Sequence, residues 1–119
     1  MTDPEIYRRI PHRPPFLFLD EIVSFDGGTI VCRKTFSGDE DFFRGHYPGN
    51  PILPGVILTE ATLQAGVLLV VKRMDATVDD IQGSPVVTRI RDARFRKIVR
   101  PGMPLEIAVE LDEILSSAY

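Results

Sequence analysis

Residues 56–74 read VILTEATLQAGVLLVVKRM, and this stretch decides the fold. It follows a Pro-Gly pair and holds a single breaker residue, Gly66, so it predicts one long helix from Val56 to about Met74. Its apolar residues surround the helix axis with little amphipathicity, which is typical of a helix wrapped by other structure. The apolar run up to Val71 is 16 residues long and contains polar side chains, which makes it too short and too polar to span a bilayer. We therefore expect a buried core helix and no membrane association.

Two strands are predicted before this helix. Residues 16–25 (FLFLDEIVSF) and 29–36 (TIVCRKTF) are rich in aromatic and β-branched residues, and Asp26-Gly27-Gly28 between them is a turn signal. The pattern indicates a β-hairpin. Residues 2–15 begin with a short helical pattern and then carry several prolines, which predicts a helical turn followed by an extended lead-in.

Two more strands are predicted after the helix. Residues 84–98 alternate between apolar and polar positions from Val86 onward, and residues 105–111 alternate again after a Pro-Gly turn. The order strand, strand, helix, strand, strand predicts an α+β fold in which an antiparallel sheet wraps one helix. A chain of 119 residues is long enough for one domain, residues 1–119, around one core.

Charge is unevenly distributed along the chain. The net charge is −3, but residues 89–100 carry six basic residues and one acidic residue. This basic stripe can attract an acidic partner, whereas a nucleic acid would repel the molecule as a whole. Two interpretations stay open, a solvated strand face and a docking site. The docking residues would be Arg91, Arg94, Arg96, Lys97 and Arg100.

Cysteine use and the N-terminus bear on the compartment. The single cysteine, Cys32, excludes an intramolecular disulfide, and the first residues show no basic-then-apolar signal pattern, so we expect a cytoplasmic protein. Two histidines and one cysteine offer no clustered ligand spacing, and no metal is predicted. Neither a glycine-rich phosphate loop nor a G-x-S-x-G motif occurs, and no cofactor is expected.

His46 and Glu60 form a candidate base and acid pair. His46 stands in residues 37–55, a segment so rich in proline and glycine that it predicts a rigid loop able to hold a catalytic group. Imidazole titrates near neutrality, which suits proton abstraction. Glu60 lies among apolar helix residues, where poor solvation favours its protonated form. The other histidine, His12, lies among prolines and is interpreted as a structural loop residue rather than a second base.

Three further residues complete the candidate site. Gln64 follows Glu60 by one helical turn, so its amide can hydrogen-bond and orient the carboxyl group. The backbone N–H groups of Gly55 and Val56 at the helix start can hold a carbonyl oxygen that gains negative charge. A base, an acid and an oxyanion site are the parts that elimination of water from a β-hydroxyacyl thioester requires.

Several short motifs occur in a fixed order along the chain. They are residues 10–17 (IPHRPPFL), 43–56 (FRGHYPGNPILPGV), Glu60-Ala61, Gln64, 94–96 (RFR) and 99–102 (VRPG). Together they strongly resemble the (3R)-hydroxyacyl-[acyl carrier protein] dehydratases of the FabZ type. The similarity covers nearly the whole chain, and the G-H-[FY]-P-x-x-P-x-x-P-G-V-x-x-x-E-A run is highly specific.

This resemblance implies a hot-dog fold and a lyase of fatty-acid biosynthesis that dehydrates (3R)-hydroxyacyl-[acyl carrier protein] to the trans-2-enoyl product. It implies a homodimer, or a trimer of dimers, in which His46 of one chain takes the α-proton and Glu60 of the partner subunit assists loss of the hydroxyl. The acidic acyl carrier protein is the implied partner of the basic stripe. Family members continue past the equivalent of Tyr119 into a last hairpin, so we expect this chain to be truncated at its C-terminus. Acyl-length preference and pathway stay open.

Two alternatives belong to other classes of function. A hot-dog acyl thioesterase would use the helix carboxylate to activate water, although the G-H-Y-P loop argues against it. A non-catalytic subunit that binds acyl carrier protein would fit a sheet without its last strands.

Overall fold

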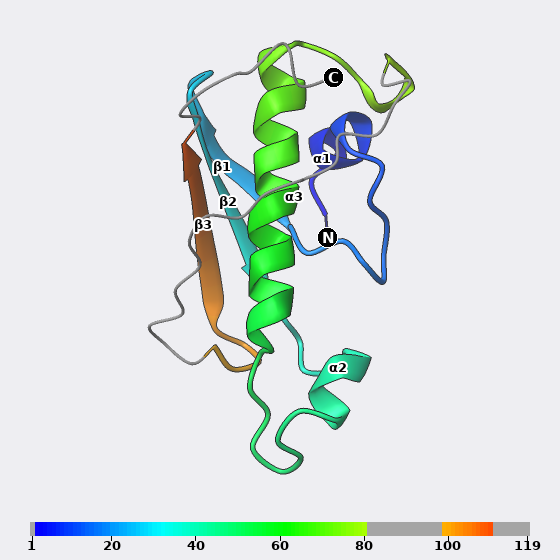
Figure 1. Cartoon of the computed structure of the whole chain (residues 1–119), viewed down its shortest axis with the longest axis vertical. Helices are drawn as coiled ribbons and strands as arrows, with labels where there is room; N and C mark the ends of the chain where they lie inside the picture. The colour runs from blue at the N-terminus through cyan, green and yellow to red at the C-terminus, as the bar shows by residue number, and fades with distance from the viewer. Residues whose placement is uncertain (1, 81–98, 111–119) are drawn as a thin grey trace.

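The computed structural model describes residues 2–80 and 99–110. The core helix, α3, spans Gly55–Arg73 and runs in front of the sheet (Figure 1). It begins after Pro54 and ends at Met74, whose N–H donates to carbonyls of the last turn. The prediction of one long helix over this stretch is confirmed.

Within residues 2–80 and 99–110, three strands form an antiparallel sheet in the order β1-β2-β3. They are β1 (Glu21–Phe25), β2 (Thr29–Thr35) and β3 (Pro104–Glu110). In the β1–β2 turn the Asp26 carboxylate accepts hydrogen bonds from Gly28 N and Thr29 N, at 2.9 and 2.7 Å. Those bonds lower the pKa of Asp26, and Gly27 takes a φ of 93° that favours glycine. The predicted hairpin and the strand near 105–111 are confirmed, and the predicted strand 84–98 lies outside the described residues.

The first strand, predicted over residues 16–25, is too long, because β1 begins only at Glu21. Asp20 N still donates to Arg33 O of β2 at 2.8 Å, but the backbone of residues 16 and 18 is held by the helix instead of a neighbouring strand. Phe18 N donates to Oε1 of Gln64 at 2.8 Å, and Phe16 O accepts from Nε2 of the same side chain at 2.9 Å. A buried side chain on α3 thus takes the place of a strand partner.

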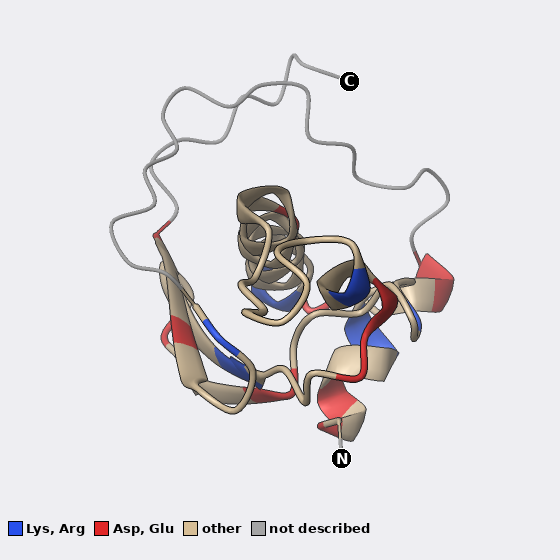
Figure 2. Ribbon diagram, turned by 90° about the horizontal axis from the view of Figure 1, so that it is seen from below, with Lys and Arg blue, Asp and Glu red and all other residues tan. Residues whose placement is uncertain are grey.

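Three short helices flank the sheet and α3. The predicted N-terminal turn is α1 (Pro4–Arg9), with Asp3 accepting from Glu5 N at its start. Neither α2 (Asp41–Arg44) nor the 3-10 turn η1 (Val78–Asp80) was predicted from the sequence. Seen along its axis, α3 has the sheet on its left and the short helices on its right (Figure 2).

The core lies between α3 and the sheet. Buried α3 residues recur every three or four positions, namely Ala61, Gln64, Ala65, Leu68, Leu69 and Val71. They pack with inward-facing residues of the strands such as Ile30, Cys32 and Ile107. Burial raises the pKa of the Cys32 thiol to about 11, so it stays protonated at neutral pH.

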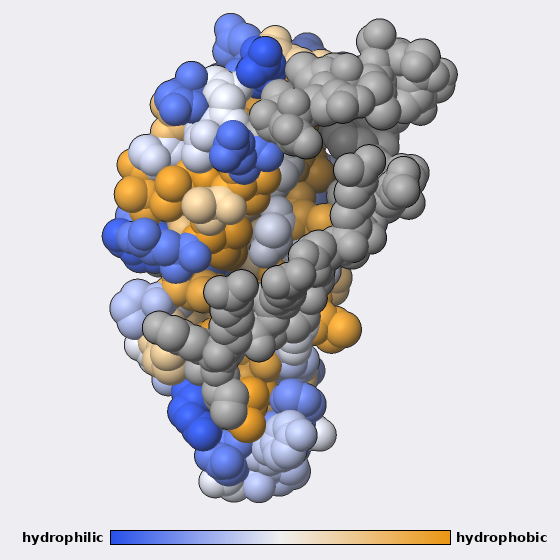
Figure 3. All heavy atoms as spheres, turned by 60° about the vertical axis from the view of Figure 1, so that its left-hand side comes forward, coloured by the Kyte–Doolittle hydropathy of each residue, from blue (hydrophilic) through white to orange (hydrophobic). Residues whose placement is uncertain are grey.

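Length and composition alone would allow α3, with 19 residues and a mean hydropathy of 1.5, to cross a membrane. The expectation that this stretch is too short and too polar is therefore not met by the helix itself. Its packing against the sheet and α1 is that of a core helix. The outer side of the sheet has apolar surface at mid-height between hydrophilic regions (Figure 3), and Val23 and Phe25 of β1 are exposed.

Candidate active site

His46 lies in the turn between α2 and α3. Its ring meets Tyr47 edge-on, with centroids 4.7 Å apart, and Tyr47 has a φ of 59°. The loop is fixed at its end by Leu53, which is buried and whose N–H donates to Val99 O at 2.7 Å. The backbone therefore holds the imidazole in place from both sides.

The tautomer of His46 follows from one hydrogen bond. Nδ1 lies 2.9 Å from the carbonyl oxygen of Ile52. A carbonyl only accepts, so Nδ1 carries the proton and donates it. In the neutral imidazole Nε2 is then the unprotonated nitrogen, which is the form that a general base needs.

Glu60 lies in the second turn of α3, and about one quarter of its side chain is exposed. Gln64, one turn later, donates from Nε2 to Oε2 of Glu60 at 3.0 Å. Gln64 is fully buried, and its amide also bonds the backbone of residues 16 and 18. The glutamine therefore connects the Glu60 carboxyl group rigidly to the segment before β1.

His12 also lies beside Glu60, a contact that the sequence does not predict. Its Nε2 is 3.8 Å from Oε2 of Glu60, and its Nδ1 is buried without a hydrogen-bond partner among the described residues. The two residues come from segments far apart in the chain, and spacing offered no signal for the contact. The interpretation of His12 as a loop residue describes its position in the chain but does not include its contact with Glu60.

The candidate acid and base do not meet within one chain. Between these two described side chains there is no ion pair within 4.0 Å, and the histidine at Glu60 is His12. His46 is held by Ile52, in the loop before α3. Among the described residues of one chain, the candidate acid and base are therefore held by different partners.

The start of α3 leaves backbone donors unused. Ile57 N and Leu58 N donate to the carbonyl of Pro54, at 3.0 and 3.3 Å. In the described part of the chain, Gly55 N–H and Val56 N–H have no backbone acceptor. They point from the positive end of the helix dipole, as an oxyanion site requires.

Of the basic stripe, only Arg100 falls among the described residues. Arg91, Arg94, Arg96 and Lys97 lie outside them. Arg100 is exposed, and its guanidinium donates to Oδ1 of Asn50. This cation therefore also ties the segment before β3 to the loop that carries His46.

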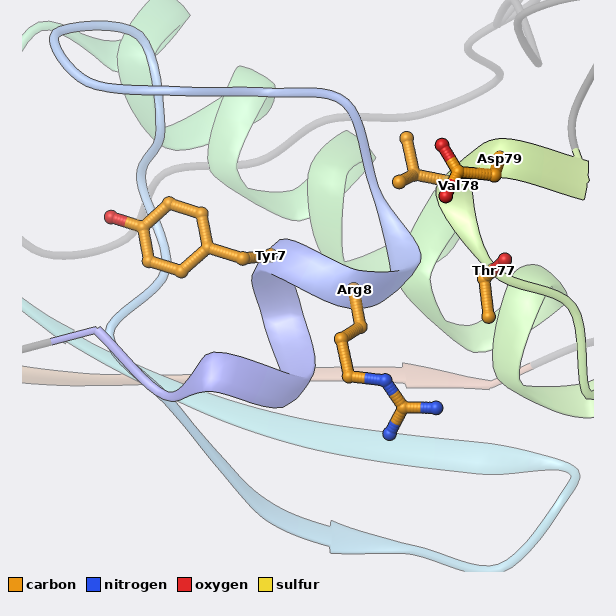
Figure 4. A pocket seen from close by; sticks show the side chains of 5 residues that line it. All are labelled: Tyr7, Arg8, Thr77, Val78 and Asp79. Carbon is orange, nitrogen blue, oxygen red and sulfur yellow. The ribbon is translucent and has the colours of Figure 1, made fainter.

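A pocket of about 320 Å³ lies elsewhere, at the other end of α3. Figure 4 shows its lining side chains, Tyr7 and Arg8 from α1 on one side and Thr77, Val78 and Asp79 on the other. None of the predicted site residues lines it. In residues 2–80 and 99–110 no group of three or more His, Cys, Asp or Glu side chains could hold a metal ion.

Comparison with known proteins connects this geometry to a family. The model of the FabA-like domain matches residues 10–119. A 3-hydroxyacyl-[acyl-carrier-protein] dehydratase FabZ of Levilactobacillus brevis is 40% identical over 113 residues, which are 93% of this chain and 73% of the relative. A dehydratase of the same name from Nitratidesulfovibrio vulgaris is 44% identical over 108 residues, 90% of this chain and 69% of the relative.

A solved structure supports the same fold. A chain of the dehydratase heterocomplex ApeI:P from Xenorhabdus doucetiae matches with a TM-score of 0.70 and 18% identity, over 93% of this chain and 73% of that chain. The expected α+β hot-dog fold is confirmed. The chain belongs to the FabA-like family, and its FabZ-type resemblance is confirmed by the curated relatives.

Proposed function

We propose that this protein dehydrates (3R)-hydroxyacyl-[acyl carrier protein] to the trans-2-enoyl thioester in fatty-acid biosynthesis. The observation that carries the proposal is the orientation of the two candidate catalytic groups. His46 keeps an unprotonated Nε2 because its Nδ1 donates to Ile52 O, and Glu60 is fixed by Gln64. A β-elimination needs two proton-transfer groups, a base and an acid, and these two side chains are held in fixed orientations that suit those roles.

The reaction follows from these roles. Nε2 of His46 removes the α-proton of the thioester, and the developing negative charge on the carbonyl oxygen is stabilised by Gly55 N–H and Val56 N–H. The bond from the β-carbon to the hydroxyl oxygen breaks, and Glu60 gives that oxygen its proton so that water leaves. The enzyme then holds an imidazolium and a carboxylate, and transfer of one proton between them restores the starting state.

The site would be completed in a homodimer, with His46 of one chain facing Glu60 of the partner subunit. Two observations support this arrangement. The two side chains do not pair within one chain. Large apolar side chains near them are exposed, since Val56 is 75%, Tyr47 60% and Phe16 52% accessible. Exposed apolar surface of this kind marks an interface or a ligand site. A trimer of such dimers is the second assembly that we propose to test.

The partner would be acyl carrier protein, which presents the substrate as a thioester. Relatives that are 40% identical to this chain are named 3-hydroxyacyl-[acyl-carrier-protein] dehydratases. Arg91, Arg94, Arg96, Lys97 and Arg100 form the proposed landing site, because a basic stripe attracts an acidic protein. The reaction would take place in the cytoplasm. A hot-dog thioesterase or a non-catalytic subunit is not favoured, since the curated relatives are dehydratases.

The proposal is tested by hydration of a crotonyl thioester, the reverse reaction, with two variants. We expect His46→Ala and Glu60→Gln each to lower kcat by about a hundredfold to ten-thousandfold. Gel filtration beside the wild-type protein checks that both variants keep their assembly. Turnover retained in both variants contradicts the assigned roles, and release of free thiol without addition of water to the double bond would select the thioesterase.

A further inference from the structure

Two side chains, and not one, face the same oxygen of Glu60. Gln64 donates to Oε2 at 3.0 Å, and Nε2 of His12 lies 3.8 Å from that oxygen. Among the described residues Oε1 takes part in no hydrogen bond. The two carboxyl oxygens of Glu60 therefore have different surroundings.

Gln64 can act toward Oε2 only as a donor. Its Oε1 accepts from Phe18 N at 2.8 Å, and its Nε2 donates to Phe16 O at 2.9 Å and to Glu60. A flip of the amide would set oxygen against a carbonyl and N–H against N–H, so the backbone fixes the orientation. Oε2 of Glu60 must then be an acceptor. When the carboxyl group is protonated, its proton lies on Oε1.

The surroundings of His12 define its tautomer in the same way. Nδ1 is buried and has no partner among the described residues. A buried N–H without an acceptor is rarer and more costly than a buried lone pair, so the proton of a neutral ring belongs on Nε2. That nitrogen is the one that faces Oε2 of Glu60.

We propose that His12 is a positioning residue for Glu60. Together with Gln64, His12 keeps Oε2 of Glu60 as a hydrogen-bond acceptor, so that the transferable proton lies on Oε1. This inference rests on the proposed function. A separation of 3.8 Å is longer than a hydrogen bond, but such contacts in a free enzyme often shorten in the substrate complex.

The arrangement has a chemical consequence. As the proton on Oε1 passes to the departing hydroxyl oxygen, the bond from that oxygen to the β-carbon breaks and water forms. Glu60 becomes a carboxylate whose charge spreads onto Oε2. Gln64 already donates to Oε2, and His12 Nε2–H faces the same oxygen, so both groups stabilise the charge once the His12 contact shortens. His12 thus assists the acid step without touching the substrate.

Variants of His12 in the full-length protein test this role by hydration of crotonyl-coenzyme A. His12→Phe keeps a ring but removes Nε2–H, and we expect kcat to fall about tenfold to a hundredfold while KM stays within about twofold. His12→Gln places an amide N–H near the Nε2 position and should restore kcat to within about fivefold of wild type. Should His12→Phe fail to fold by circular dichroism, His12→Asn replaces it, since that amide is too short to reach and should show the same loss.

A purely structural role would give a different pattern. It predicts that His12→Gln is as impaired as His12→Phe, or that KM rises while kcat is kept, and either result overturns the inference. So does a kcat of His12→Phe within about twofold of wild type. If His12 acts through Glu60, adding His12→Phe to Glu60→Gln should change the residual rate by less than about twofold.

Failure of this inference can be told from failure of the proposed function. If Glu60→Gln is inactive while His12→Phe keeps its kcat, Glu60 remains the acid and only the role of His12 is wrong. If Glu60→Gln keeps its activity, the acid role fails, and the inference about His12 fails with it.

Discussion

Gln64 donates from Nε2 to Oε2 of Glu60 across one turn of α3, at 3.0 Å, while both ends of its amide are bound by the backbone of residues 16–18. This one side chain joins the core helix to the segment before β1. It therefore contributes to the fold and to the orientation of the candidate acid at once.

Replacing Gln64 should affect stability and activity together. Gln64→Leu leaves Phe18 N–H and Phe16 C=O without their partner, and the unsatisfied N–H of Phe18, which is buried, costs about 1–3 kcal/mol. We expect a lower free energy of unfolding in urea titrations and a kcat about tenfold to a hundredfold lower. Thr62→Ala, at an exposed position of the same helix, serves as the control and should shift the unfolding free energy by about 0.5 kcal/mol or less. Equal stability of Gln64→Leu and wild type would contradict the role of the buried amide.

A site shared between subunits predicts complementation of two inactive variants. In a mixed dimer of His46→Ala and Glu60→Gln chains, one site combines the intact His46 with the intact Glu60, and the other site has neither. A purified mixed dimer, isolated with two different affinity tags, should regain about half of the wild-type kcat per dimer. A dimer of two differently tagged His46→Ala chains is the control. If the mixed dimer is no more active than this control, the site lies within one chain.

Periodicity and turn chemistry predicted most of the described fold. The apolar run predicted α3 to within a residue at each end, and Asp26-Gly27-Gly28 predicted the β1–β2 turn. The start of β1 was missed because Gln64, a residue distant in sequence, competes for the backbone of residues 16–18. Local patterns do not contain a tertiary hydrogen bond of this kind.

In the candidate site, too, local spacing predicts some contacts and does not predict others. Gln64 could be placed beside Glu60 because residues four apart share a helix face. His12 could not, because the contact depends on how the lead-in after α1 crosses α3, which no local pattern encodes. The helix α2 also escaped prediction, since it is only four residues long and is stabilised by packing of Phe42 and Phe43 against Phe36.

Arg100 allows docking to be separated from loop support. Its guanidinium is exposed and bonds Asn50, in the loop of His46. If Arg100 contacts acyl carrier protein, Arg100→Ala should raise KM for a carrier-bound substrate by up to about fivefold, since an exposed charge pair contributes at most about 1 kcal/mol. The effect should fade at high salt and be absent with crotonyl-coenzyme A. Asn50→Ala is the matched control, because it removes only the loop contact. Identical effects of both variants on both substrates would assign Arg100 to the loop alone.

The ion pairs that Glu5 forms within α1 and with the end of α3 predict how the free energy of unfolding depends on pH. Nε of Arg9 donates to Oε1 of Glu5 at 2.6 Å, and Nζ of Lys72 lies 3.3 Å from the same oxygen. Arg9 is itself buried and also binds the Ala76 carbonyl. The hydrogen bond from Arg9, with a further contribution from Lys72, holds the pKa of Glu5 below its ordinary value of 4.5.

Because the pKa of Glu5 is lower in the folded than in the unfolded chain, its stabilising effect is present at neutral pH and is lost as the pH falls through the folded value. We expect Glu5→Gln to lower the free energy of unfolding by about 1–3 kcal/mol at neutral pH. The difference from wild type should shrink as the pH falls below 4.5, where the unfolded chain takes up the proton first, and should disappear below the folded pKa of Glu5, where both states are protonated. Asp41→Asn, which breaks a pair with Arg44 whose side chains are 88% and 77% exposed, is the control and should change little at any pH. Urea titrations across this pH range measure both, and a Glu5→Gln deficit that persists undiminished in acid would show that the carboxylate charge is not its cause.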